Sequence, residues 1–462
     1  MIGVLGILVS LALLMYLAYR GINVLVLAPV LALFAALIGG EPQLLATYTQ
    51  VFMTSLGGFL AKYFPLFLLG AIFGRLMSDS GSAATIARWI VARLGAKRAP
   101  LAIVLSCAIL TYGGVSVFVV VFAAYPIAVA LFRAAGTPKR LIPGAIVLGS
   151  ATFTMSGLPG SPAIQNAIPM PFFGTDPFAA PGLGTIAAAM MLGFGMFWLN
   201  RRSRRAESAG EGYGDHPLEH LDASPSEHRP GLMIALLPII LVIAVNLAVT
   251  KWLIPSMDVA YLAEKKYGGV TLNEVRGIWS LIVALAVAVV AASVLHWRRW
   301  TDLLTSVNQG TMRSLLPIFN TASEVGYGTV IASLTAFAVI KAFVIGIAPG
   351  NPLISEAIAV NIMAGITGLA SGGMSIALGM LGKTYLELGN AAGISPELLH
   401  RVAAIASGGL DSLPHNGAVI TMLGICRLTH RQSYLDIFMV SVIGPLIALT
   451  AVLILGTTLG AF

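Results

Sequence analysis

The chain has 462 residues, of which 57% are hydrophobic and only 10% are charged. An ordinary soluble domain has roughly 25% charged residues, so this composition excludes a soluble enzyme and a nucleic-acid-binding protein. The net charge of +8 comes from 27 basic and 19 acidic residues. The basic residues cluster at the ends of apolar runs, where they indicate membrane topology rather than a nucleic-acid partner.

Seven apolar segments approach the roughly 20 residues that a membrane-spanning helix needs. In chain order they are Ile2–Tyr19, Ile22–Ile38, Tyr63–Met77, Leu183–Leu199, Gly231–Val249, Gly277–Leu295 and Tyr434–Leu459. The first segment lacks the basic residues and the A-x-A site of a cleavable signal peptide, so we interpret it as a membrane helix.

Four other apolar stretches are interrupted by Gly, Pro, Ser and Asn. They cover residues 100–135, 141–175, 352–390 and 396–426. If 100–135 and 352–390 are hairpins that enter and leave on one side, the basic residues predict ten full crossings plus two hairpins, with both termini outside. Cys107 and Cys426 lie in these apolar stretches and are predicted to be free buried thiols.

The only soluble-looking segment follows the arginine-rich end of the fourth span. Residues 201–230 begin with RRSRR and continue with acidic residues and His216, His220 and His228. Because this composition cannot bury a core, we predict a solvated cytoplasmic loop between two halves of the protein. A metal-binding loop is the alternative reading of the histidines.

The chain also resembles itself. TYGGVS at Thr111–Ser116 and ASGGMS at Ala370–Ser375 contain GGxS pieces 259 residues apart. LPGSPAIQN at 158–166 and LPHNGAVIT at 413–421 lie 255 residues apart. The basic residues start the first copy outside and the second inside, so we predict inverted repeats, a feature of secondary transporters.

The predicted organisation has five parts. These are N-terminal scaffold helices at 1–40, a first inverted repeat at 41–200, the cytoplasmic loop at 201–230, linking transmembrane helices at 231–300 and a second inverted repeat at 301–462. The predicted fold class is an all-α integral membrane protein, an inverted-repeat transporter with two re-entrant hairpins and two broken helices.

Each GGxS piece lies midway along an apolar stretch and is predicted to be a hairpin tip. Gly114 and Gly373 permit a tight turn and a close approach to a ligand. Ser116 and Ser375 would stand near the start of the returning helix, where free N–H groups and about half a positive elementary charge favour a carboxylate. The alternative is that these glycines serve close helix packing.

Two longer stretches, 155–162 and 407–417, are predicted to unwind between half-helices, because they are too rich in Gly and Pro for a simple proline kink. Carbonyl groups freed there could hold a cation. Polar side chains in and after these breaks are candidates for substrate binding. They are Ser161, Gln165, Asn166, Ser412, His415, Asn416 and Thr421.

Ionisable side chains in a membrane cost about 2.5–3.5 kcal/mol each on insertion scales, so they often have a function. Asp411 and His415 stand four residues apart in the second break, and Glu324 lies in a Gly-rich stretch. Burial favours a protonated carboxyl group and histidine titrates near neutral pH, so these three are candidates for proton coupling. A helix-capping role is the alternative for Asp411.

No nucleotide-binding G-x-x-x-x-G-K-[ST] motif and no H-E-x-x-H motif occurs, so we predict neither ATP drive nor a metal or other cofactor. Ser412 and His415 form only a nominal nucleophile and base, which makes a membrane enzyme a weaker alternative. A cation/proton antiporter would require two acidic carriers facing one cavity.

The stretch DSLPHNGAVITMLGICRLTHRQSY, 411–434, resembles the C-terminal signature of gluconate permease (GntP) family transporters, and SGLPGSPAIQNAIP, 156–169, fits the same family. The resemblance implies membership of the ion transporter superfamily. It further implies a scaffold, a mobile subdomain with two hairpins, an elevator-like movement, a homodimer and a multi-pass location in the bacterial inner membrane.

The same resemblance implies a symporter that imports a small organic acid, such as gluconate or 3-hydroxybutyrate, together with H+. Na+ is the alternative coupling ion, because other members of the superfamily use it. The apolar PMPFF stretch, 169–173, favours a short acid with few hydroxyl groups.

Overall fold

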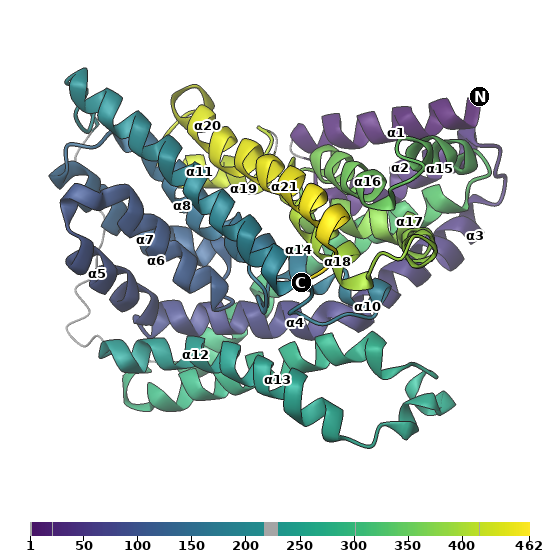
Figure 1. Ribbon diagram of the computed structural model, residues 1–462, viewed down its shortest axis with the longest axis horizontal. Helices are drawn as coiled ribbons and strands as arrows, with labels where there is room; N and C mark the ends of the chain where they lie inside the picture. The colour runs from purple at the N-terminus through teal and green to yellow at the C-terminus, as the bar shows by residue number, and fades with distance from the viewer. Residues whose placement is uncertain (1, 21, 217–229, 301, 415) are drawn as a thin grey trace.

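The computed structural model describes residues 2–20, 22–216, 230–300, 302–414 and 416–462, and every regular element in these ranges is a helix (Figure 1). Six described helices are long and apolar enough to cross a membrane, or up to eight spans result if two sharply bent pairs each count as one. Helices α1 (Ile2–Tyr19), α2 (Val24–Ile38) and α16 (Pro352–Thr367) are apolar but shorter. Length and composition therefore do not by themselves reach the ten expected crossings.

Two long helices pack against each other at the centre of the molecule. Helix α4 (Met53–Asp79) follows the short α3 (Leu44–Ala46) and a π-helical turn, and α14 (Leu303–Ser333) begins after the capping residue Asp302. A Cβ atom at Gly310 would lie only 2.7 Å from the Ile72 Cα, so this glycine permits the close contact. Ser306 near the start of α14 donates a hydrogen bond to Asp79 at the end of α4, which shows that the two helices run antiparallel.

The first predicted hairpin is present. Helix α6 (Ala99–Tyr112) and helix α7 (Val117–Ala134) pack together and are joined by residues 113–116. Gly114 has a φ of 92°, a conformation that residues with a Cβ atom rarely adopt, so glycine is required at this turn. The turn leads directly into the first residues of α7.

The second predicted hairpin is formed by α16 and α17 (Ala370–Ala391). Asn351 accepts a hydrogen bond from Leu353 N and so begins α16, and Gly368, with a φ of 64°, ends it. The tip is therefore Gly368–Leu369. The predicted tip around Gly373 and Ser375 is wrong, because both residues lie inside α17.

Both predicted breaks are present, but their second halves differ in length. In the first copy, α8 (Ile142–Ser150) leads to a π-helical turn and an irregular stretch, followed only by two four-residue helices, α9 (Ile164–Ala167) and α10 (Met170–Phe173). In the second copy, α18 (Pro396–Ser407) is followed by an irregular stretch and by α19 (Gly417–Ile425). Only the second break thus separates two helices of substantial length.

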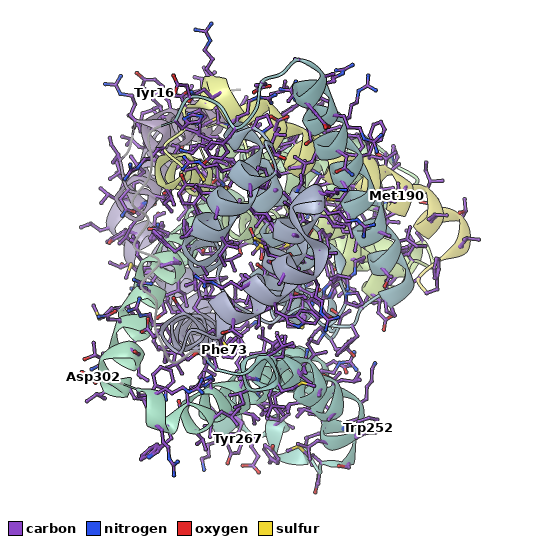
Figure 2. The ribbon with its side chains drawn as sticks, turned by 90° about the vertical axis from the view of Figure 1, so that its left-hand side faces the viewer. Tyr16, Phe73, Met190, Trp252, Tyr267 and Asp302 are labelled. Carbon is purple, nitrogen blue, oxygen red and sulfur yellow. The ribbon has the colours of Figure 1, made fainter. Side chains whose placement is uncertain are left out.

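The remaining helices surround these elements (Figure 1). They are α5 (Ser82–Leu94), α11 (Pro181–Ser208), α12 (Leu232–Ala248), α13 (Leu272–Leu295), α15 (Phe337–Gly346), α20 (His430–Phe438) and α21 (Gly444–Leu459). Helices α12 and α13 form a separate layer below α4, and Figure 2 shows Trp252 and Tyr267, from their connection, at the outer edge of this layer. Helices α11 and α21, the last long helices of the two halves, pack against each other.

A buried carboxylate connects the two halves away from the breaks. The Asp436 side chain, on α20, is 1% exposed and accepts hydrogen bonds from Trp198 Nε1 at 2.9 Å, Arg202 Nε at 3.0 Å and Arg140 Nη1 at 3.2 Å. Arg140 also forms a two-pronged pair with Glu211, at 2.7 and 2.9 Å. We refer to Arg140, Trp198, Arg202, Glu211 and Asp436 as the Asp436 cluster.

Candidate functional site

Both hairpin tips and both breaks line one cavity of about 300 Å³. From the first half come residues 114–118 at one tip and 162–165 in one break. From the second half come residues 369–371 at the other tip, together with Asp411, Ser412 and Asn416. The centres of α4 and α14 close the cavity with Leu66, Phe67 and Pro317 among others. Residues far apart in sequence therefore form a single site.

Three helix N-termini reach this cavity. They belong to α7, α17 and α19, and the first residues of each helix are among those that line it. The first N–H groups of an α-helix have no partner within the helix and carry a partial positive charge. Neither Ser116 before α7 nor Leu369 before α17 makes a side-chain capping bond, so neither side chain occupies these N–H groups.

The cavity wall is mainly apolar, with a few polar groups. Thr111 is 3% exposed, and its Oγ1 has no hydrogen-bond partner among the described residues. The same holds for the buried Oε1 atom of Gln165, which also lines the cavity. Buried polar atoms are nearly always hydrogen-bonded, so these two groups are available for a bound molecule.

Six of the predicted site residues line this cavity: Gly114, Ser116, Gln165, Asp411, Ser412 and Asn416. Ser412 donates its hydroxyl hydrogen to Asp411 Oδ1 at 2.9 Å. This bond stabilises the carboxylate form and leaves the second carboxyl oxygen of Asp411 free of side-chain donors among the described residues.

Asn416 lines the cavity, but its amide group is fully engaged by the protein. Its Oδ1 accepts from the Ala418 and Val419 N–H groups at 2.6 and 2.9 Å, which caps α19. Its Nδ2 donates to Gly368 O at 2.6 Å and to Asp411 O at 2.7 Å. Asn416 therefore connects the second hairpin tip to the second break and positions both.

Two predicted ligands of the first break, Ser161 and Asn166, do not line the cavity. Ser161 is fully buried and donates to Thr154 O at 2.9 Å. Asn166 is also fully buried and donates to Ser161 O and Pro177 O at 3.0 and 2.9 Å. Both side chains are used to hold the irregular backbone in place.

Gly373 and Ser375 also lie away from the cavity. A Cβ atom at Gly373 would be 2.2 Å from Ala364 N, so this glycine permits close packing of α17 on α16. Ser371, near the second hairpin tip, lines the cavity as Ser116 does. It lies 255 residues after Ser116, which is also the spacing of LPGSPAIQN and LPHNGAVIT. The GGxS match was therefore out of register by one helical turn.

The other predicted residues have different positions. Thr421 is exposed on α19. Glu324 on α14 is 1% exposed and lies against Gly372 behind the second hairpin tip, with Oε2 lacking a hydrogen-bond partner among the described residues. His415 lies outside the described residues. Arg75 and Asp79 form an i,i+4 ion pair at 2.7 Å, and Cys107 and Cys426 are both buried.

Arg313 on α14 is a cavity residue that sequence reasoning missed. It lines the cavity and also an open groove with Thr305, Asn308 and Gln309. In the part of the chain that the structure covers, its side chain has no hydrogen bond or ion pair. The stretch that forms α14 was not among the predicted spans, so Arg313 was not recognised as a charge in a membrane helix, where a cation usually has a partner or a function.

Arg401 on α18 was missed as well. Its side chain is fully buried, and five hydrogen bonds connect it to the first break and the segment that follows. The neighbouring His400 contacts Asn166 Oδ1 at 3.2 Å and Thr175 Oγ1 at 2.6 Å. A helix of the second half therefore stabilises the break of the first half.

Comparison with solved structures shows the same fold in two membrane transporters. The YdaH transporter of Alcanivorax borkumensis has a TM-score of 0.58 at 16% identity, with 88% of each chain covered. MtrF of Neisseria gonorrhoeae, described as illuminating a class of antimetabolite efflux pumps, has a TM-score of 0.56 at 12% identity, with 93% of this chain and 94% of that chain covered. At these identities the likeness concerns the fold.

Comparison of sequences finds a relative at higher identity. An uncharacterised transporter of Bacillus subtilis (strain 168), YxjC, is 45% identical over 456 residues, which is 95% of each chain. Residues 2–320 match the GntP family permease description. The similarity inferred from residues 156–169 and 411–434 is thereby confirmed, and the chain is a multi-pass membrane transport protein that belongs to the GntP family of permeases.

Proposed function

We propose that the protein is a secondary active symporter that imports a small organic hydroxycarboxylate, such as 3-hydroxybutyrate or gluconate, with H+ across the bacterial inner membrane. The observation that carries this proposal is the convergence of three helix N-termini on one cavity. The first N–H groups of α7 and α17 have no side-chain cap, whereas those of α19 are capped by Asn416, and the aligned peptide dipoles of all three helices favour an anion there.

The charges around the cavity support a carboxylate as the substrate. Arg313 supplies a guanidinium group without a partner among the described residues, and a guanidinium binds a carboxylate in a two-pronged geometry. Thr111 and Gln165 offer polar atoms for a hydroxyl group. The wall around them is mainly apolar, with Leu66, Phe67 and many other hydrophobic side chains, so a short acid with few hydroxyl groups fits better than a polyol acid.

Asp411 is the proposed proton carrier. Among the described residues that line the cavity it is the only one with a carboxyl group, and it belongs to the second break. A protonated Asp411 would leave Arg313 free to pair with the substrate, whereas an ionised Asp411 would add a negative charge beside the bound carboxylate. This electrostatic difference couples proton binding to substrate binding.

Movement of the site is proposed to be elevator-like. The two hairpins, α8–α10 and α18–α19 would move as one transport subdomain against a scaffold that includes α1, α2, α12 and α13. The antiparallel contact of α4 with α14 and the similar order of a long helix, a hairpin and a broken helix in the two halves support inverted repeats. Assembly as a homodimer remains an expectation from the family.

The test is uptake of labelled 3-hydroxybutyrate and gluconate into proteoliposomes, with inward pH and Na+ gradients imposed separately. We expect the pH gradient to drive accumulation. Asp411→Asn should abolish accumulation but retain part of the substrate exchange, because the amide cannot carry a proton. Glu387→Gln, which changes an exposed carboxyl group on α17, is the matched control. Accumulation by Asp411→Asn under a pH gradient would refute the assignment.

A Na+ gradient that alone drives uptake would identify the Na+-coupled symporter instead. Na+ transport in exchange for H+, with neither acid carried, would identify the cation/proton antiporter. A membrane hydrolase would convert substrate in detergent without any gradient.

A further inference from the structure

We propose that the Arg401 guanidinium occupies the position that an exchangeable cation would take at the first break, so that only the second break can bind a coupling cation. The inference rests on the proposed function, because it concerns the coupling ion of that same transporter. It assigns a role to a buried charge that substrate binding does not use.

The contacts of Arg401 are those of a cation held by backbone oxygens. Nη1 donates to Ser156 O at 3.3 Å and Gly157 O at 3.2 Å. Nε and Nη2 donate to Ala179 O at 3.0 and 2.6 Å. Four of its five hydrogen bonds thus go to carbonyl oxygens, and the fifth goes to the amide oxygen of Asn166 at 3.3 Å.

Two of these carbonyls belong to the helical turn that ends at the break. Carbonyl groups at the C-terminus of a helix have no partner in the helix and carry a partial negative charge. In transporters with discontinuous helices, such unwound carbonyls and helix C-termini coordinate Na+. Because Arg401 already binds them, a second cation at this place would meet both occupied oxygens and a fixed positive charge.

The positive charge of Arg401 strongly opposes the binding of a second cation at the first break. Arg401 is fully buried, so water does not screen it well. Repulsion between two unit charges in contact near a protein surface weakens binding of the second one roughly a thousandfold. A free Na+ ion therefore does not compete with a guanidinium that is covalently tethered and permanently charged.

The second break has no equivalent guanidinium. In the 255-residue register of the repeats, the residue that corresponds to Arg401 is Ile146 on α8. The second break instead has Asp411, whose carboxyl group lines the cavity. The two halves therefore differ in charge, with a resident cation in the first break and a titratable acid in the second.

Thermal unfolding of purified protein in detergent tests the inference without substrate, with Na+ or Li+ replacing choline at equal ionic strength. Asp411→Asn, in which Arg401 is intact and the acid of the second break is removed, should have the same unfolding midpoint in all three salts. Arg401→Gln should unfold at lower temperature in choline and be stabilised by Na+ or Li+ by about 3 °C or more. Arg401→Lys should need no added cation.

Arg276→Gln is the matched control, because Arg276 also donates to a backbone carbonyl, Gly174 O at 3.3 Å, but is not fully buried. It should show no response to Na+. Cation stabilisation of Asp411→Asn would overturn the inference, because this variant has lost the acidic ligand of the second break while Arg401 is present. If Arg401→Gln folds but its unfolding midpoint is not raised by Na+ or Li+, the inference would also be overturned.

If Arg401→Gln does not fold, the Asp411→Asn measurement alone decides. These readouts require no transport, so a failure of the proposed carboxylate uptake leaves them unaffected and the two proposals can fail separately.

Discussion

Replacement of Asn416 tests whether one side chain connects the second hairpin to the second break. Asn416→Ser keeps an oxygen that can cap α19 but removes the Nδ2 donor to Gly368 O and Asp411 O. Hydrogen bonds between helices of membrane proteins contribute about 0.6 to 1.7 kcal/mol each. Two lost bonds therefore predict a destabilisation of about 2 kcal/mol. Asn416→Ala also loses the cap, which adds about 1 kcal/mol.

The assay is the thermal unfolding midpoint in detergent, measured together with the apparent affinity for substrate in proteoliposomes. Ser395→Ala is the control, because Ser395 caps α18 with one bond at 3.3 Å and does not line the cavity. It should lower stability by about 1 kcal/mol or less and leave uptake unchanged. If Asn416→Ser matched this control in stability and wild type in uptake, the connection we infer would be refuted.

The remaining predictions concern charges. Arg313→Gln should weaken substrate affinity about 10- to 100-fold, because hydrogen bonds to charged groups contribute about 1.5–3 kcal/mol. The control Lys383→Gln, at an exposed site, should leave the affinity unchanged. An unchanged KM for uptake by Arg313→Gln would contradict this prediction. Asp436→Asn should destabilise the protein by about 3 kcal/mol in thermal unfolding, because it leaves two arginines without their buried carboxylate. The hydrogen bond from Arg140 lowers the pKa of Glu211 below its ordinary 4.5. Glu211→Gln should therefore be slightly less stable than wild type, by an amount that is constant above pH 4.5. This difference should disappear once the pH falls through the lowered pKa, because Glu211 of the wild type is then protonated.

Some features of this protein follow from local sequence. Apolar length placed α1, α2 and α12 within two residues of their observed bounds, because a membrane helix satisfies its own backbone and needs only an apolar surface. The predicted segments 183–199 and 277–295 lie inside the longer helices α11 and α13, and 434–459 covers part of α20, a π-helical turn and α21. The two hairpin stretches and the two breaks were also found, since Gly and Pro interrupt helices through their own backbone properties.

The register of the second hairpin was not predictable in this way. Gly368 and Gly373 both stand in an apolar stretch, yet one adopts a positive φ at the tip and the other packs against Ala364 N. A glycine at a turn and a glycine at a close helix contact have the same local sequence signal. The distinction depends on which backbone lies opposite.

The sequence by itself determined that this is an all-helical membrane protein with two helical hairpins and two breaks, and its motifs were sufficient to identify the family. Only the tertiary structure decided which polar residues face the cavity. Asn166 and Ser161 turn inward to hold the backbone, whereas Arg313 reaches the site from α14. Contacts between residues more than 200 positions apart, such as Arg401 with the first break, depend on how whole helices pack and leave no local trace in the chain.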